Sequence, residues 1–330
     1  RPGGDLGQEI RRLGCEQIGQ ASTELSGSAG LGRGVHEARK CIKRTRALLS
    51  FARPGLSKRD FTKHDRRLRT ISRSLAPARD WQAMLECLDR LDERFGKGWN
   101  PDIVGALRAG FQGRKQRAEA VLSQGTLEKT ARQLKKAHRR FAKLDVDGRK
   151  LSVGRGLEPA YARGRKRFWR ACRVGDGRAY HDWRKEAQRH WRHMQLLVAA
   201  WPDEMAVRTD RARALSQCLG DDHDLHILLG YVGASGPDIG SWRDLERFYD
   251  GCIEQQFALR MAARSHGQLL FTERPPAFRR RISGYWRAAS ERYSQGARLP
   301  ATILQDCKVV PIRPARPETD RAIPPTLVGE

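Results

Sequence analysis

The chain has 330 residues, and its 64 Lys and Arg side chains exceed its 38 Asp and Glu side chains, for a formal net charge of +26 at pH 7. Hydrophobic residues make up 39% of the chain and there are 32 glycines, a composition near that of ordinary globular proteins. This excludes a wholly disordered basic tail. The longest apolar run has six residues, Leu196–Trp201, whereas a membrane span needs about 20. The strong positive charge indicates a polyanionic partner: a nucleic acid, an anionic membrane surface or a phosphate polymer.

Helical periodicity runs through nearly the whole chain, and no stretch shows the alternation of a strand. Proline, glycine and asparagine interrupt it, for example at Pro54-Gly55 and Asn100-Pro101. We therefore expect an all-α protein with about twelve helices, over residues 6–25, 34–52, 57–75, 77–94, 102–122, 126–144, 157–173, 178–200, 202–219, 221–232, 239–265 and 275–295. From Arg298 the chain is rich in proline and polar residues, which predicts a poorly ordered or surface-draped tail.

Cysteines occur singly along the chain. There are seven, an odd number, and none forms a Cys-x-x-Cys pair. Most lie among apolar residues with helical spacing, which is typical of small core side chains. We therefore expect free, reduced thiols and a cytoplasmic location.

Two short segments recur at a nearly constant offset. Val35–Lys40 is followed 145 positions later by the similar Tyr180–Lys185, and Leu75–Trp81 is followed 144 positions later by Leu219–Leu225. Two matches at nearly one offset predict a duplicated helical bundle. We expect a first repeat over 1–145, a second over 146–297 and the Pro-rich tail over 298–330.

The first recurring segment opens a helix with one cationic face. On a helical wheel the basic residues that gather around His36 are Arg39, Lys40, Lys43, Arg44 and Arg46. The second copy gathers Arg184, Lys185, Arg189 and Arg192 around His181. Few acidic side chains accompany them, and like charges on one helix repel by several tenths of a kcal/mol per pair. Such a face indicates a ligand surface rather than an ordinary solvated one, and its histidines should resist protonation until a polyanion binds.

Other helices carry basic residues at the same spacing of three or four positions. One series is Lys129, Arg132, Lys136, Arg139 and Lys143, and another is Arg163, Lys166, Arg167 and Arg170. Arg suits phosphate oxygens through paired hydrogen bonds and Lys through a mobile charge. From these series we include Lys136, Arg139, Arg163, Lys166 and Arg170 among the candidate ligand residues.

The pattern His-x-x-Arg-Lys near the start of each half, with Arg79-Asp80-Trp81 and Asp224-Leu225 downstream, resembles the CHAD domain, the conserved histidine α-helical domain. The resemblance covers about residues 5–295. It implies two tandem, pseudo-symmetric helical bundles with a basic groove or pore between them that binds inorganic polyphosphate, and a location at polyphosphate granules. Some members are fused to a CYTH triphosphatase domain. The chain has no Glu-x-Glu-x-Lys motif, so we expect a standalone member.

The resemblance also implies which residues bind phosphate. In the first repeat they are His36, Arg39, Lys40, Lys43, Arg44 and Arg46, and in the second His181, Arg184, Lys185 and Arg189. The second copy departs from the pattern, because Gln188 stands at the position of Lys43 and Trp191 at that of Arg46. Arg192, one position later, can substitute, and we expect the second half to hold fewer phosphates.

Two groups of residues point to other chemistry. Asp221–His226 is dense in metal-ligand types, but at a helix N-terminus its acids would simply complement the helix dipole. The pairs His64-Asp65 and His181-Asp182 resemble those of metal-dependent phosphohydrolases, without the further ligands such enzymes need. We expect no metal, no cofactor, no membrane partner and no catalytic residues. A nucleic-acid or nucleoid-binding protein remains the alternative, and a phosphohydrolase a weaker one. His190 and most of the eight tryptophans are expected in the core rather than as base-stacking platforms.

Overall fold

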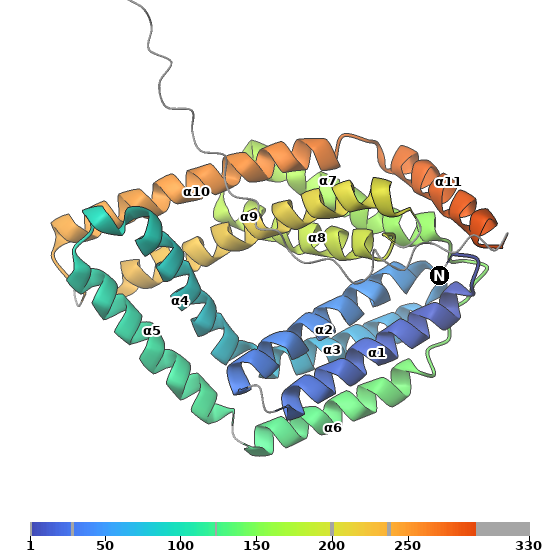
Figure 1. The fold of residues 1–330 in the computed structure, drawn as a ribbon, viewed down its shortest axis with the longest axis horizontal. Helices are drawn as coiled ribbons and strands as arrows, with labels where there is room; N and C mark the ends of the chain where they lie inside the picture. The colour runs from blue at the N-terminus through green and yellow to red at the C-terminus, as the bar shows by residue number, and fades with distance from the viewer. Residues whose placement is uncertain (1, 28–29, 123, 199–200, 236–238, 295–330) are drawn as a thin grey trace, which may run out of the picture. The chain divides into compact units, whose positions relative to one another are not determined.

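The computed structural model describes residues 2–27, 30–122, 124–198, 201–235 and 239–294, and this part is all-α, without strands (Figure 1). Its eleven α-helices are α1 (Leu6–Ser26), α2 (Leu31–Ala52), α3 (Lys58–Ser74), α4 (Ala76–Phe95), α5 (Pro101–Val121), α6 (Gln124–Phe141), α7 (Val153–Val174), α8 (Gly177–Gln195), α9 (Pro202–Ser235), α10 (Trp242–Leu270) and α11 (Pro275–Ser294). Two short 3-10 helices, Arg53–Gly55 and Gly96–Gly98, follow α2 and α4. The expected tail over 298–330 lies outside the described residues.

Several helices begin where the sequence offers a capping side chain. The carboxylate of Asp5 accepts hydrogen bonds from the backbone N–H groups of Gly7 and Gln8 at the start of α1. Asn100 accepts one from Asp102 before α5, whose first residue is proline. These side chains satisfy N–H groups that have no partner inside the helix, which is why the interruptions in the periodicity predicted helix starts.

The expectation of two helices over 202–219 and 221–232 is wrong, because one continuous helix, α9, spans both. In the first half α3 and α4 are separate, and Pro77 stands in the first turn of α4. Proline has no N–H to donate to the carbonyl four residues earlier, so it interrupts a helix. The corresponding residue of the second half, Asp221, keeps its N–H, and the helix runs on. The other helices agree with expectation to within a few residues, and α8 ends at Gln195 rather than near 200.

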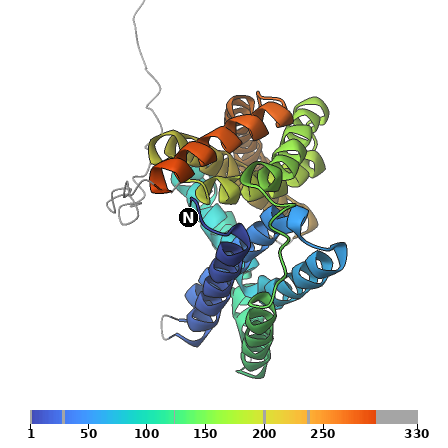
Figure 2. The same cartoon turned by 90° about the vertical axis from the view of Figure 1, so that its right-hand side faces the viewer.

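Similar helix pairs pack together before and after residue 145. In the first part α1 packs against α2 and α6, and α4 against α5. In the second part α7 packs against α8 and α11, and α9 against α10. Figure 2 shows α1 and α6 at the bottom of the view and α11 at the top. Between the two parts, α2 packs against both α7 and α8. A duplicated bundle would produce such matching pairs; the duplication and its boundary at 145 stay a prediction.

The buried apolar side chains form two clusters in the described part of the chain. One joins α1, α2, α3 and α6 to helices of the second part, with Ile42 and Trp183 fully buried. The other joins α4 and α5 to α9 and α10, with Phe111 packed near Leu228 and Phe248. Each cluster draws side chains from before and after residue 145, so the two predicted repeats share their cores.

The described cysteines and tryptophans test the expected core. All six described cysteines are free, as expected, and Cys307 lies outside the described residues. Trp183 is fully buried, but Trp169 is 50% exposed and Trp242 75%, so the expected core position is wrong for these two. No helix in the described ranges is long and apolar enough to cross a lipid bilayer.

Candidate functional site

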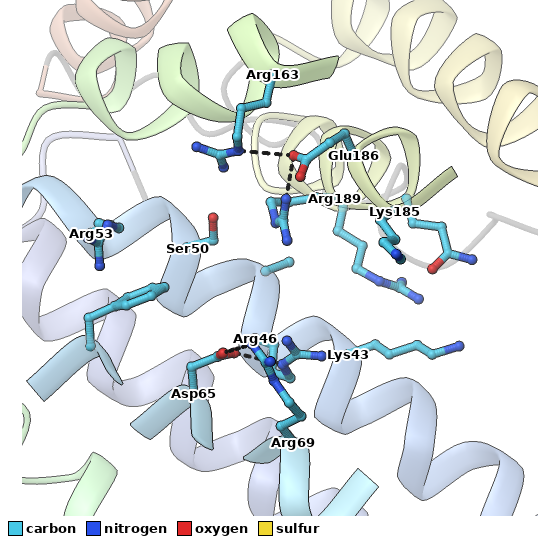
Figure 3. A pocket seen from close by; sticks show the side chains of 14 residues that line it. Lys43, Arg46, Ser50, Arg53, Asp65, Arg69, Arg163, Lys185, Glu186 and Arg189 are labelled. Carbon is cyan, nitrogen blue, oxygen red and sulfur yellow. Dashed lines mark hydrogen bonds and ion pairs between the residues drawn. The ribbon is translucent and has the colours of Figure 1, made fainter. Parts of the chain in front are cut away.

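A pocket of about 340 Å³ lies between α2 and α8, with residues of α3 and α7 at its edges. Figure 3 shows side chains of α2 and α3 on one side of it and side chains of α7 and α8 on the other. Two carboxylates, Asp65 and Glu186, line it together with eight basic side chains. The basic residues are Lys43, Arg46, Arg53, Arg69, Arg163, Lys185, Arg189 and Arg192. The pocket therefore joins both predicted repeats and is strongly cationic.

The two main helices present this surface because their other faces are buried. Ile42 and Leu49 of α2 and Trp183 and Ala187 of α8 belong to the core. Residues three and four positions apart share one face of a helix, so the basic residues Lys43 and Arg46 of α2 and Lys185, Arg189 and Arg192 of α8 form stripes away from the buried ones. Basic residues of α2 and α8 thus face each other across the pocket; of the recurring segments themselves, only Lys185 lines it.

Lys43 is the cation most strongly affected by its neighbours. Its pKa is lowered to about 7, mainly by burial and then by the charges of Arg39, Arg184, Arg192 and Arg79, in that order. All four are cations, and they come from α2, α8 and α4. Arg192 is affected in the same way, since burial and then Arg44 lower its pKa to about 10. Without a ligand, the positive charges in and around the pocket therefore exceed the negative ones.

The two carboxylates compensate only part of this charge. Asp65 accepts hydrogen bonds from Arg46 Nε over 2.8 Å and from Arg69 Nη2 over 2.6 Å. Burial opposes the ionisation of Asp65, but these bonds outweigh it and hold its pKa below the ordinary value. Glu186 pairs with Arg189 and, over 3.2 Å, with Arg163. These ion pairs orient four of the basic side chains at the edge of the pocket.

The two histidines of the recurring segments have different partners. Arg79 Nε donates to His36 Nδ1 over 2.7 Å, whereas His181 Nδ1 lies 3.2 Å from His223 Nδ1. Burial is the main cause that lowers the pKa of each, followed by Arg79 and Lys40 at His36 and by Lys185 and Arg184 at His181. The lowered pKa values agree with the expectation that these histidines are hard to protonate in the free protein, although burial contributes more than the cationic face; the effect of a bound polyanion stays a prediction. Neither lines the pocket.

Arg39 of α2 and Arg184 of α8 stand at corresponding positions of the recurring segments, and neither lines the pocket. Arg39 donates to the Ser72 carbonyl over 3.0 Å and lies 3.5 Å from an oxygen of Asp80. Arg184 is half-buried, its Nε has no hydrogen-bond partner in the described part of the chain, and Asp224 is the carboxylate that acts on it most. Burial still lowers the pKa of both arginines.

The structure brings together only part of the predicted ligand set. The predicted residues that line the pocket are Lys43, Arg46, Arg163, Lys185, Arg189 and Arg192. Arg39, Arg44 and Arg184 act on them through their charges. Lys40 pairs with Glu37 over 2.8 Å one turn away.

Four predicted residues lie elsewhere. Lys136 and Arg139 are exposed on α6, which packs against α1 and α3, and Lys136 lines a separate hollow between α3 and α6. Lys166 and Arg170 are exposed on another face of α7 and line a hollow of their own. The structure thus separates these four from the pocket, and their role as phosphate ligands stays a prediction.

Sequence reasoning missed three arginines of the site. Arg53 and Arg69 line the pocket but belong to no recurring segment, so nothing in the sequence pointed to them. The sequence did offer a signal for Arg79, because this residue lies in the second recurring segment. Arg79 contacts His36, and the residue at the corresponding position of the second half, His223, contacts His181.

The acidic cluster Asp221–His226 does not stand at a helix N-terminus, so the predicted capping role is wrong. It lies within α9, where Asp222 is 3% exposed and pairs with Arg260 over 2.6 Å. No group of three or more His, Cys, Asp or Glu side chains in the described ranges could hold a metal ion. His190 is buried as expected, although its Nε2 finds no hydrogen-bond partner among the described residues.

The fold and the pocket define an all-α protein with a cationic pocket between helices from both parts of the chain. The family model of the CHAD domain matches residues 20–232, which include α2, α8 and both recurring segments. The match covers most of the chain, and the chain belongs to the CHAD domain family. A comparison with curated proteins found no match.

Proposed function

We propose that this chain binds inorganic polyphosphate in the pocket between α2 and α8. The observation that carries the proposal is the lining of eight basic side chains against two carboxylates, drawn from four helices and the turn after α2. Membership of the CHAD domain family is consistent with polyphosphate-related binding. Targeting to polyphosphate granules, or organising them, belongs to the same proposal.

The distribution of charge favours a linear polyanion over a single phosphate. Along the pocket the basic residues of α2 and of the turn after it run from Lys43 through Arg46 to Arg53, which at 1.5 Å per residue is about 15 Å. A chain of phosphates can contact all of them at once and releases its bound counterions when it does so. Arginines would bind phosphate oxygens in pairs, and Lys43 as a point charge. The proposal is a binding function without a catalytic step or cofactor.

Competitive binding tests the proposal. Labelled long-chain polyphosphate competes with duplex DNA of matched charge and with free phosphate across a salt series. The double variant Lys43→Glu with Arg192→Glu should bind polyphosphate at least tenfold more weakly. The control, Arg243→Glu with Arg247→Glu, changes the net charge at least as much on exposed positions of α10 and should bind as the parent does.

Three outcomes contradict the proposal. If both double variants lose affinity equally, only the total charge matters and the pocket is not the site. If duplex DNA competes as well as polyphosphate, the protein is a nucleic-acid binder. Phosphate release that a chelator stops would indicate a metal-dependent phosphohydrolase.

A further inference from the structure

A second hollow, of about 610 Å³, follows the exposed face of α7 and is bounded by Pro275 at the start of α11. Its lining combines apolar and basic side chains, among them Trp169, Val174 and four Arg or Lys residues, and includes no carboxylate. None of its residues lines the pocket between α2 and α8. It is therefore a separate feature of the molecule.

Trp169 is the aromatic centre of this hollow. It is 50% exposed, although its neighbour Phe168 is buried in the core. The guanidinium of Arg165 lies 6.0 Å from its ring, and Arg165 Nε donates to the Phe271 carbonyl over 3.0 Å. The indole thus stands beside an anchored cation with half of its surface open to water.

The cations around Trp169 lack the partners that other arginines of α7 have. Arg163 pairs with Glu186 and Arg167 with Asp182. Lys166, Arg170 and Arg173 have no carboxylate within ion-pair distance among the described residues. Like charges three and four positions apart repel on a helix, so an unpaired series of this kind suits an anionic ligand.

We propose that this hollow binds single-stranded nucleic acid, with a base stacked on Trp169 and backbone phosphates on Lys166, Arg170 and Arg173. Single strands are bound without sequence preference by grooves that combine basic residues with an exposed aromatic ring. Lys166 and Arg173 are seven residues apart on α7, about 10 Å along the helix, which is room for a short stretch of backbone.

Other polyanions fit this hollow less well. Inorganic polyphosphate has no apolar face that would cover the indole of Trp169. A lipid surface carries both charge and apolar groups, but it is flat on this scale, whereas Trp169 lines a hollow. A nucleotide supplies a planar ring and a phosphate at short distance from each other, and so matches both parts of the lining.

The test is the binding of a labelled oligothymidylate to the full chain, followed by fluorescence anisotropy. Trp169→Ala should weaken binding by about tenfold, since stacking of one base supplies a factor of about five or more. Trp169→Phe keeps an aromatic face and should stay close to the parent. Trp242→Ala removes the other strongly exposed tryptophan, on α10, and should change nothing.

A second pair of variants separates this hollow from the pocket. Lys166→Gln with Arg170→Gln should weaken oligothymidylate binding more than Lys185→Gln with Arg192→Gln does, although both remove two charges. The reverse order would place the oligonucleotide in the pocket and overturn the proposal. Duplex DNA bound as tightly as the single strand, with Trp169→Ala unaffected, would also overturn it. So would Trp169-dependent binding to phosphatidylserine vesicles by a chain that does not bind the oligonucleotide.

Discussion

His193 of α8 donates a hydrogen bond from Nε2 to the carbonyl of Ala47 on α2, over 2.9 Å. Both residues are buried, and they lie on the two helices that form the cationic pocket. Burial lowers the pKa of His193 to about 4, so its ring is neutral at neutral pH. The bond is a direct link between helices that the sequence places far apart.

Removing this link should cost stability. His193→Ala leaves the Ala47 carbonyl buried without its partner and opens a cavity, and we expect a loss of about 2–4 kcal/mol in the free energy of unfolding. Urea denaturation measures it. His226 is exposed on α9, and His226→Ala should stay within about 0.5 kcal/mol of the parent. Equal losses in both variants would mean that the link contributes nothing.

The buried histidines should make the fold sensitive to mild acid. The pKa of His190 is lowered to about 3 and that of His193 to about 4, both mainly by burial, from an ordinary 6.5. Below pH 6.5 these histidines are protonated in the unfolded chain but stay neutral in the folded chain. Their contribution to the free energy of unfolding is therefore fully present above pH 6.5 and is lost as the pH falls toward 4. Each histidine contributes about 1.4 kcal/mol per pH unit in that window.

One variant separates the contribution of His193 to this pH dependence from that of His190. His193→Gln does not titrate and keeps a side-chain N–H for the Ala47 carbonyl. The free energy of unfolding, measured at pH 7.5, 6.5 and 5.5, should therefore fall less steeply with falling pH for this variant than for the parent. Below pH 6.5 the two slopes should differ by about 1.4 kcal/mol per pH unit. An unchanged slope would show that His193 is protonated in the folded state.

Polyphosphate should bind together with a proton near neutral pH. Burial and the cations Arg39, Arg184, Arg192 and Arg79 lower the pKa of Lys43 to about 7 in the free protein. A bound polyanion supplies opposite charge and raises that pKa toward its ordinary value. Binding then takes up a proton between pH 7 and the raised value, so affinity falls as the pH rises above 7.

Calorimetry at pH 8 in two buffers of different ionisation enthalpy measures this uptake. Lys43→Arg keeps the charge at all these pH values, so it should bind polyphosphate without the Lys43 proton and with a flatter pH dependence. If the variant and the parent take up the same number of protons, the proton goes to another group, and Lys43 is charged before the ligand arrives.

The buried carboxylate of α9 should matter to folding. Asp222 accepts a hydrogen bond from Arg260 Nε over 2.6 Å, and Arg260 also donates to the Gly175 carbonyl. Asp222→Ala leaves the guanidinium without its charge partner, and we expect a loss of about 3 kcal/mol in urea denaturation. Asp210 is exposed on the same helix, and Asp210→Ala serves as the control, with a loss below about 0.5 kcal/mol. A small effect at Asp222 would show that its pair with Arg260 contributes little to the stability of the fold.

Local chemistry explains what was predictable. The all-α fold, most helix starts and the basic faces of α2 and α8 followed from periodicity and from capping residues such as Asp5 and Asn100. These features depend on neighbours within about one helical turn, and a sequence records such neighbours directly. The recurring segments added which two helices belong to one site.

Packing decided the rest. The regular spacing of Arg163, Lys166 and Arg170 predicted one basic surface, but α7 turns Arg163 to the pocket and the other two to a separate hollow. The sequence around Asp222 resembles a helix start, but in the structure Asp222 pairs with Arg260 of α10. The pKa of Lys43 is lowered by burial and then by cations from α2, α8 and α4. Desolvation and the approach of distant charges arise only when those helices pack, and for that reason the tertiary structure decided the chemistry of the site.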